Sequence, residues 1–346
     1  MGRLRRWLNW KVRLAIWACL VLGTAGAVTW LMWMPGRSFR GELGSWSDQE
    51  QLVARELKEH VRALAETIGP RNAHTLLAQR QVRAELEAAA DYVEGSLEES
   101  GYSVQRQAYQ VKGHGYANLE AVRPGRIAEV VVVGAHYDSF PGTPGADDNA
   151  SGVAALLVLA RLFRDVEPDR ELRFVAFTNE EPYFFQTEDM GSLVYARRCK
   201  ERNETVVAML SLETMGYYTD RSGAQHYPFP LGFFYPDTGD FVAFVGDLSS
   251  RPLLHRCLAR FRGTTRFPSE GASLPAWLPG VGWSDHWAFW QVGYPALMVT
   301  DTAPFRNPHY HQPEDTWDRL DYPRMSRVVL GLREVITGLA SADARR

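Results

Sequence analysis

The stretch that decides the fold is residues 134–152, GAHYDSFPGTPGADDNASG. An apolar run rich in valine, residues 130–135, leads into it, and an apolar helix-like run, residues 153–163, follows it. The order strand, Gly/Pro loop, helix is typical of one unit of an α/β fold. Such folds place their chemistry in loops at the carboxyl ends of the strands, so we expect this loop to be functional.

The loop carries a histidine and two consecutive aspartates, His136, Asp147 and Asp148. Imidazole and carboxylate are ligands that zinc takes when one coordination position stays open to water. Each group alone has a simpler interpretation, because a lone His-x-Asp is usually a loop feature and Asp-Asp-Asn can form a turn with a helix N-cap. We expect Asp147 to have that structural role and consider Asp148 a candidate ligand.

More candidate ligands follow further along the chain. Two β-like runs, residues 170–178 and 206–212, each end in acidic residues, and a late loop adds a histidine. The candidates at these three places are Glu180, Glu181, Glu213 and His311. A constellation at the ends of several strands is a stronger indication of a metal site than any one of its members.

These residues resemble the co-catalytic di-zinc aminopeptidase family, the type that includes bacterial leucyl aminopeptidases and glutamate carboxypeptidase. The resemblance covers about residues 50–340. The ligand at Glu213 is an aspartate in many relatives, and glutamate offers the same donor atoms with a longer reach. The residues that carry the resemblance are His136-Tyr-Asp138, 145–152, Glu180-Glu181, Glu213, Ser284-Asp285-His286, 293–296 and Tyr310-His311.

The resemblance implies a cofactor of two Zn²⁺ ions. One zinc would be held by His136 and Glu213, and the second by Glu181 and His311. Asp148 would bridge the two, because a shared carboxylate offsets the repulsion between ions about 3.5–4 Å apart.

The resemblance also implies roles for residues beside the metals. Glu180 would be the general base, since a second carboxylate beside the attacking water can take its proton and pass it to the leaving amine. Asp138 would orient His136, because a ligating histidine usually donates its other nitrogen to a carboxylate. The hydroxyl of Tyr310 would donate to the developing oxyanion.

Alternating strand-like and helix-like segments predict an α/β fold with a mixed, mostly parallel central sheet and helices on both faces. Residues 229–237 and 262–282 are rich in Pro, Gly and aromatic residues without a clear period, and we expect them to wall the substrate cleft. The remaining predicted strands are residues 102–111, 115–123, 241–246 and 296–300, and the predicted helices are residues 51–68, 80–100, 251–261 and 322–339.

The N-terminus predicts a membrane anchor. Residues 1–13 contain five basic residues and no acid, and residues 14–34 carry no charge. As a helix, these 21 residues span about 31 Å, close to the hydrocarbon thickness of a bilayer. The basic segment would stay cytoplasmic, so the catalytic domain, residues 47–346 after a linker of residues 35–46, would lie on the periplasmic or extracellular side. A cleaved signal peptide is the alternative, with a small-residue site at residues 25–27.

The composition of the chain agrees with a large α/β domain. The chain has 346 residues, of which 45% are hydrophobic, enough for one large α/β domain after the N-terminal segment. The net charge of −3 gives no indication of nucleic-acid binding. Cys199 and Cys257 could pair in an oxidising compartment, but nothing in the sequence brings them together, and we expect two buried free thiols.

Four functions remain open at this point. The first is an aminopeptidase that removes N-terminal residues from peptides. The second is a mono-zinc acyltransferase resembling glutaminyl cyclase, whose relatives have a Thr-Asp-Ser-Ala type sequence where this chain has residues 147–152, DDNASG, the peptidase form. The third is a receptor-type ectodomain without activity, which the complete ligand set disfavours. The fourth is a carboxypeptidase for acidic C-terminal residues, which needs arginines in its pocket.

Overall fold

The computed structural model describes residues 10–72 and 80–342. The chain divides into two units, Met1–Pro35 and Gly36–Arg346. The first contains helix α1 (Trp10–Met32), which is long and apolar enough between Val12 and Met32 to cross a membrane or to be a signal sequence. The assignments of residues 1–13, 14–34, 35–46 and 47–346 to separate segments stay predictions, and residues 1–9 lie outside the described residues.

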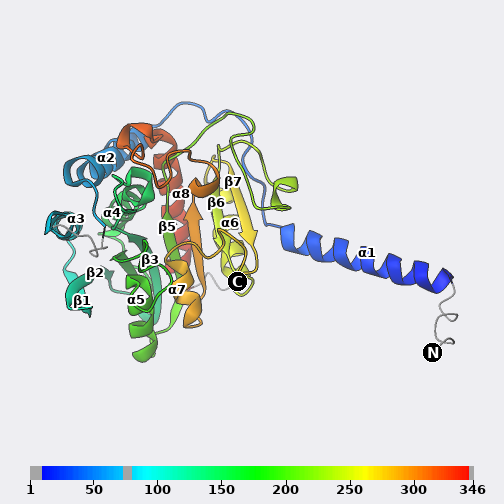
Figure 1. Ribbon diagram of the computed structural model, residues 1–346, viewed down its shortest axis with the longest axis horizontal. Helices are drawn as coiled ribbons and strands as arrows, with labels where there is room; N and C mark the ends of the chain where they lie inside the picture. Colours follow the sequence, from blue (N-terminus) through cyan, green and yellow to red (C-terminus); the bar gives the residue numbers. More distant parts are fainter. Residues whose placement is uncertain (1–9, 73–79, 343–346) are drawn as a thin grey trace. The chain divides into compact units, whose positions relative to one another are not determined.

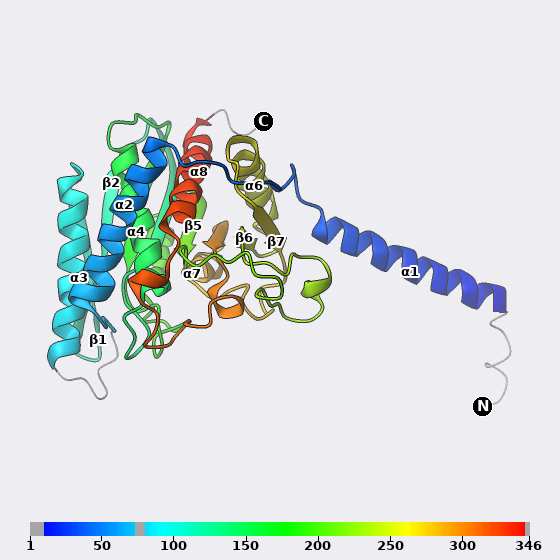
Figure 2. The same ribbon diagram turned by 90° about the horizontal axis from the view of Figure 1, so that it is seen from above.

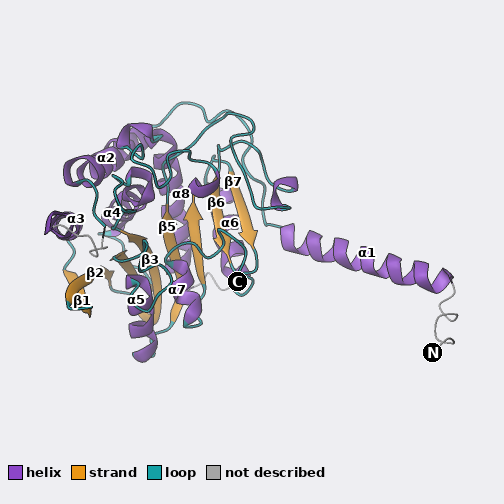
Figure 3. Cartoon of the chain, viewed as in Figure 1, coloured by secondary structure: helices purple, strands orange, loops and turns teal. Residues whose placement is uncertain are grey.

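The second unit is built on one mixed sheet of eight strands (Figures 1 and 3). The strands are β1 (Val104–Val111), β2 (His114–Arg123), β3 (Ile127–His136), β4 (Arg170–Phe177), β5 (Val206–Glu213), β6 (Val242–Gly246), β7 (Ser269–Ser273) and β8 (Ala296–Thr300). Their order is β1-β2-β4-β3-β5-β8-β6-β7. The neighbours β4, β3, β5 and β8 run parallel, whereas β2 and β6 pair antiparallel to this central group. The predicted mixed, mostly parallel sheet is confirmed.

Helices cover the sheet in two groups. Helices α2, α4 and α8 contact one another, with α3 and α6 beside them, and Figure 2 shows the five arranged along the sheet. Helices α5 and α7 pack together against a separate part of the core. The bounds are α2 (Asp48–Arg62), α3 (Arg80–Glu99), α4 (Gly152–Phe163), α5 (Gly191–Glu201), α6 (Arg251–Thr264), α7 (His286–Gln291) and α8 (Tyr322–Ala340).

Strand β3 illustrates why its sequence is apolar on both sides. Val130 and Val132 belong to the core cluster that also contains Tyr195 of α5 and Phe289 of α7. Val131 points the other way, because successive strand residues face opposite sides of the sheet, and β3 contacts α4 as well. A strand buried on both faces reads as a continuous hydrophobic run.

Local signals explain the element boundaries. The Ser47 hydroxyl accepts from the Glu50 backbone N–H, and the Glu50 side chain accepts from the Ser47 backbone N–H, which gives α2 a complete capping box. Strands β1 and β2 form a hairpin that turns at Lys112 and Gly113, both with positive φ (49° and 79°). The sequence did not predict α5, α7 and β7. Helix α7 has only six residues, and β7 lacks β-branched residues and forms by pairing with β6.

Candidate metal centre and active site

The site lies where the carboxyl ends of three parallel strands meet. His136 is the last residue of β3, Glu213 is the last of β5, and Glu180 follows β4 by three residues. Because β3 pairs in parallel with both β4 and β5, these ends fall at the same edge of the sheet. The loop before α4 adds Asp148, and the loop before α8 adds His311. The fold therefore brings together residues from five separate segments.

Asp148 lies between two histidines. Its Oδ1 is 3.4 Å from His136 Nε2, and its Oδ2 is 3.0 Å from His311 Nε2. Each oxygen of one carboxylate thus faces a different imidazole. This is the arrangement that a carboxylate shared by two cations requires.

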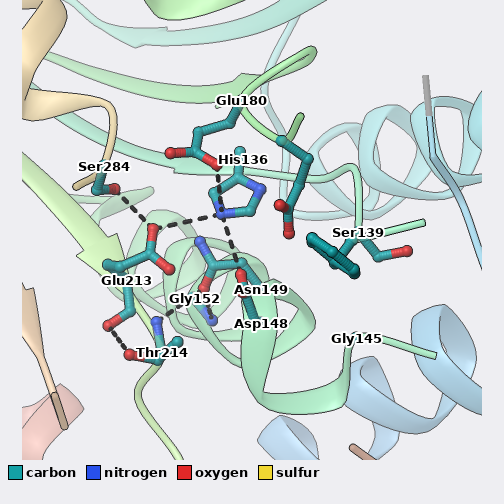
Figure 4. Close-up of polar contacts among 12 residues, drawn as sticks. His136, Ser139, Gly145, Asp148, Asn149, Gly152, Glu180, Glu213, Thr214 and Ser284 are labelled. Carbon is teal, nitrogen blue, oxygen red and sulfur yellow. Dashed lines mark hydrogen bonds and ion pairs between the residues drawn. The ribbon is translucent and has the colours of Figure 1, made fainter. Parts of the chain in front are cut away.

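Three glutamates complete the cluster, and Figure 4 shows two of them, Glu180 and Glu213, beside His136. Glu213 Oε2 is 3.3 Å and Glu180 Oε2 is 3.7 Å from His136 Nε2. Glu181 Oε2 is 3.7 Å from the Nε2 of His311. The predicted ligands therefore divide between the two histidines, and Glu180 sits on the His136 side.

Unpaired buried atoms show that the cluster fits a metal. His136 Nε2, Asp148 Oδ1 and Glu181 Oε1 are buried and have no hydrogen-bond partner. Leaving such atoms unsatisfied costs about 1–3 kcal/mol each. Potential ligand atoms of His136, Asp148 and Glu181 lie within 4.8 Å of one another, as do those of His136, Glu180 and Glu213. Nitrogen and carboxylate oxygen at this spacing are a donor set for zinc.

The electrostatics of the cluster favour the uptake of positive charge. Burial raises the pKa values of Glu180 and Glu181 well above their ordinary range, and neighbouring carboxylates add to the effect. Burial opposes the imidazolium of His136, but the surrounding carboxylates, led by Glu180 and Glu213, together raise the pKa of His136 well above its ordinary value. A divalent cation held by these groups would offset their negative charge, and its ligands would bind it in the deprotonated form.

Asp138 connects the ends of β3 and β4. Its Oδ1 accepts from the Glu180 backbone N–H at 3.2 Å, and its Oδ2 accepts from the Glu181 backbone N–H at 3.1 Å. The His136 Nδ1 lies 3.2 Å from the Asp138 carbonyl oxygen and 3.5 Å from Oδ1. One buried carboxylate therefore fixes both glutamates and contacts the histidine ring.

Asn149 and Asp147 tie the Asp148 loop to the other loops of the site. The Asn149 Oδ1 accepts from the Gly152 and Thr214 backbone N–H groups, both at 3.1 Å, so it joins the first residue of α4 to the residue after Glu213. Asp147 Oδ1 accepts from the Gly216 backbone N–H at 3.0 Å. Its Oδ2 accepts from Asn307 Nδ2 at 2.8 Å, in the loop that leads to His311.

Arg71 supports the same loop from beneath, and sequence reasoning missed it. Its fully buried guanidinium donates to the carbonyl oxygens of Tyr137 (2.8 Å), Pro144 (2.5 Å) and Gly145 (2.7 Å). Gly145 has a φ of 58°, and a Cβ there would lie 2.3 Å from the Asp148 carbonyl oxygen. An arginine that binds only carbonyl groups leaves no periodic or charge-pair signal in the sequence.

Two further supports were also missed. The imidazole of His311 stacks between the rings of Phe140 and Tyr310, with ring centroids at 3.9 and 3.8 Å. Ser284 Oγ donates to Glu213 Oε2 at 2.6 Å. Ser284 was part of the sequence resemblance, but its partner could not be inferred without the fold.

An apolar cavity of about 90 Å³ adjoins Glu213 and Tyr310. Both segments expected to form walls, residues 229–237 and 262–282, contribute to its lining. Its aromatic and aliphatic side chains include Tyr227, Leu231, Tyr235, Phe241, Val245, Leu274, Val281, Trp283, Met298 and Phe305. No arginine or lysine of the described residues lines it. The site therefore combines a buried cluster of carboxylates and histidines with an apolar cavity beside it.

Cys199 and Cys257 are free and buried. Burial raises the pKa of both thiols to about 12, which makes them unreactive as thiolates at neutral pH. The Nε2 of His286 lies 2.7 Å from the Val281 carbonyl oxygen, so this buried histidine has a structural contact.

Solved structures with a similar fold include a zinc aminopeptidase from Bacillus subtilis, with a TM-score of 0.66 and 16% identity over 88% of this chain and 98% of that one. They also include a Bacteroides thetaiotaomicron glutaminyl cyclase, with a TM-score of 0.62 and 18% identity over 86% of this chain and 99% of that one. At these identities the likeness concerns the fold.

The comparisons of sequence identify the family. The Escherichia coli (strain K12) "Uncharacterized protein YfbL" is 38% identical over 286 residues, 80% of this chain and 85% of that protein. A "Probable leucine aminopeptidase" of Arthroderma otae is 27% identical over 229 residues, 62% of this chain and 56% of that protein. The model of peptidase family M28 matches residues 118–229 and 261–336, which include most of the site described above. The chain belongs to peptidase family M28.

Proposed function

We propose that this protein is a membrane-anchored, exported aminopeptidase with two zinc ions that removes N-terminal residues from peptides. The observation that carries the proposal is Asp148, whose two oxygens face His136 and His311 separately. Membership of a peptidase family and the aminopeptidases among its relatives support the activity.

The proposed ligand set follows the two sides of this carboxylate. His136 and Glu213 would hold one zinc, Glu181 and His311 the other, and Asp148 both. When bound, paired zinc ions polarise a carbonyl oxygen and lower the pKa of a bound water toward ~7. The unpaired buried atoms of His136, Asp148 and Glu181 support this assignment.

We assign proton transfer to Glu180. Its carboxylate faces the cluster and is not needed to complete either proposed ligand set. It would take a proton from the attacking water at a carboxylate oxygen and deliver it to the nitrogen of the leaving amine as the peptide bond breaks. Asp138 fixes the position of this group through the Glu180 backbone N–H.

Tyr310 is the proposed donor to the oxyanion. It lies beside the cavity and next to His311 in sequence. Burial and the surrounding carboxylates raise the pKa of its hydroxyl well above its ordinary value. The hydroxyl therefore stays protonated at neutral pH and can donate a hydrogen bond to the negative charge that develops on the carbonyl oxygen.

The apolar cavity is the proposed pocket for the N-terminal side chain. Its lining favours an aliphatic or aromatic residue, because apolar area removed from water contributes about 25 cal/mol per Å². Glu213 lines the cavity where it meets the cluster and, together with Glu180, would hold the free α-amine. The lack of arginine and lysine among the described lining residues counts against a carboxypeptidase for acidic residues.

Hydrolysis of a panel of substrates tests the activity. We expect zinc-dependent release from amino-acid anilides with a free amine and apolar side chain, and none from the same compounds with a blocked amine. A peptide with N-terminal glutamine serves as the second arm, because a pyroglutamyl product would favour the cyclase. Release of C-terminal residues would favour the carboxypeptidase.

Protease access tests the proposed location. We expect the full-length chain to fractionate with membranes. Its second unit, Gly36–Arg346, which we call the catalytic unit, should be cleaved by protease added outside the cytoplasmic membrane. Protection of that unit in intact spheroplasts would reverse the orientation drawn from the basic residues 1–13. A soluble mature form beginning near Val28 would remove the anchor and leave an exported enzyme.

A further inference from the structure

One loop of the catalytic unit exposes large aromatic side chains. This aromatic loop, residues 227–235, has the sequence YPFPLGFFY and contains no charged residue. Phe229 is 86% exposed, Phe233 79% and Phe234 48%. The rings of Phe229 and Phe233 contact each other edge to face, with centroids 6.1 Å apart. Apolar groups gathered on a surface in this way mark an interaction site.

The opposite side of the loop is firmly packed. The rings of Tyr227 and Tyr235 stack at 5.6 Å, and both side chains line the apolar cavity. Tyr227 Oη donates to the Pro236 carbonyl oxygen at 2.6 Å. Tyr235 Oη donates to the Gly271 carbonyl oxygen of β7 at 3.0 Å. The loop is therefore held in place with its phenylalanines pointing outward.

The chain enters the catalytic unit at the same strand. The Ser269 backbone N–H, at the start of β7, donates to Ser38 Oγ at 2.9 Å. Arg262 of α6 donates to the carbonyl oxygen of Gly36 at 3.5 Å and to that of Ser269 at 2.6 Å. In sequence, only residues 33–35 separate Gly36 from the end of α1 at Met32.

We propose that the aromatic loop is a membrane-contact surface, with Phe229, Phe233 and Phe234 inserted into the interfacial layer of a lipid bilayer. The proposal rests on the membrane anchor proposed above and goes beyond it. A chain that leaves a bilayer at Met32 and is bound to β7 a few residues later keeps β7 near that bilayer. The aromatic loop is attached to the same edge strand through Tyr235, so it is then within reach of the lipid.

The composition of the loop favours lipid as the occupant. Exposed phenylalanine side chains on a loop without charge suit the boundary between headgroups and acyl chains. The consequence is that the cavity would take its substrates close to the membrane surface.

Site-directed fluorescence on the full-length chain in phosphatidylcholine–phosphatidylglycerol vesicles tests the proposal. The background variant is Cys19→Ser, because Cys19 is exposed whereas Cys199 and Cys257 are buried. An environment-sensitive probe is attached through Phe233→Cys. The matched control is Lys112→Cys, an exposed turn position between β1 and β2 at the other edge of the sheet.

We expect a blue-shifted emission at position 233 and a loss of intensity when the vesicles carry nitroxide-labelled lipid, with neither change at position 112. Phe229→Cys provides a second probe site with the same expectation. Equal signals at 233 and 112, or no quenching at 233 and 229, would overturn the proposal. A blue shift at 233 caused by added peptide, without lipid quenching, would also overturn it and identify a peptide-binding surface.

Two controls separate this inference from the proposed function. Flotation of the protein with the vesicles reports the anchor. Protein that floats without lipid quenching keeps the anchor and loses the inference, and protein that does not float loses both. Hydrolysis of a leucine anilide reports the active site independently of either result.

Discussion

Replacing Asp138 by asparagine isolates the group that holds the two glutamates. The change keeps the size of the side chain, but an amide has only one oxygen for the two backbone N–H groups of Glu180 and Glu181. One of these N–H groups must then face the NH₂ of the new side chain. A buried donor without an acceptor costs about 1–3 kcal/mol.

We expect the less firmly held glutamates to bind zinc more weakly. At about 1.4 kcal/mol per tenfold change in affinity, this cost corresponds to a loss of roughly 5- to 150-fold. This range agrees with the 10- to 100-fold loss that is usual when a group behind a metal ligand is changed. Competitive titration of zinc against a chelator measures it, and Asp165→Asn, at a side chain that is 84% exposed, controls for the chemical change. Zinc affinity equal to that of the control would refute the reasoning.

The other predictions concern proton transfer, loop support and pH. Glu180→Gln should lower kcat by about 10²–10⁴-fold with normal zinc content, and loss of zinc would instead make Glu180 a ligand. Arg71→Lys should lower the free energy of unfolding by about 2–4 kcal/mol, because an ammonium cannot reach all three carbonyl groups; an unchanged denaturant midpoint would contradict this. Burial raises the pKa values of Asp285, Asp301 and Asp315 from 3.8 to about 7. These three carboxyl groups therefore bind more protons in the folded, chelator-treated protein than in the unfolded chain, and their contribution to the thermal midpoint should fall as pH rises from about 4 to 7; an unchanged pH dependence after Asp285→Asn would count against these shifts.

The sequence predicted the residues of the cluster because each has a local signal. His136 and Glu213 end apolar strands, and Asp148 lies between a Gly/Pro turn and a helix. Parallel pairing of neighbouring strands then explains why these ends meet at one edge of the sheet. The long apolar strands and amphipathic helices were also predictable, because each leaves a local pattern in the sequence.

What the sequence could not provide are the contacts that exist only in the folded chain. Arg71 acts through carbonyl groups more than sixty residues away, and Ser284 acts on Glu213 across the core. Strand β7 forms by pairing with β6, although its own sequence, SEGAS, has little strand propensity. Such features depend on long-range pairing that local patterns do not record.

The number of zinc ions bound per chain tests the central claim most directly. Purified full-length protein, saturated with zinc and freed of loosely bound metal, should contain two equivalents. Asp148→Asn should lower that number and abolish hydrolysis of a leucine anilide, because the carboxylate serves both ions. One equivalent in a fully active wild-type enzyme would contradict the two-zinc account and favour the mono-zinc cyclase type of site.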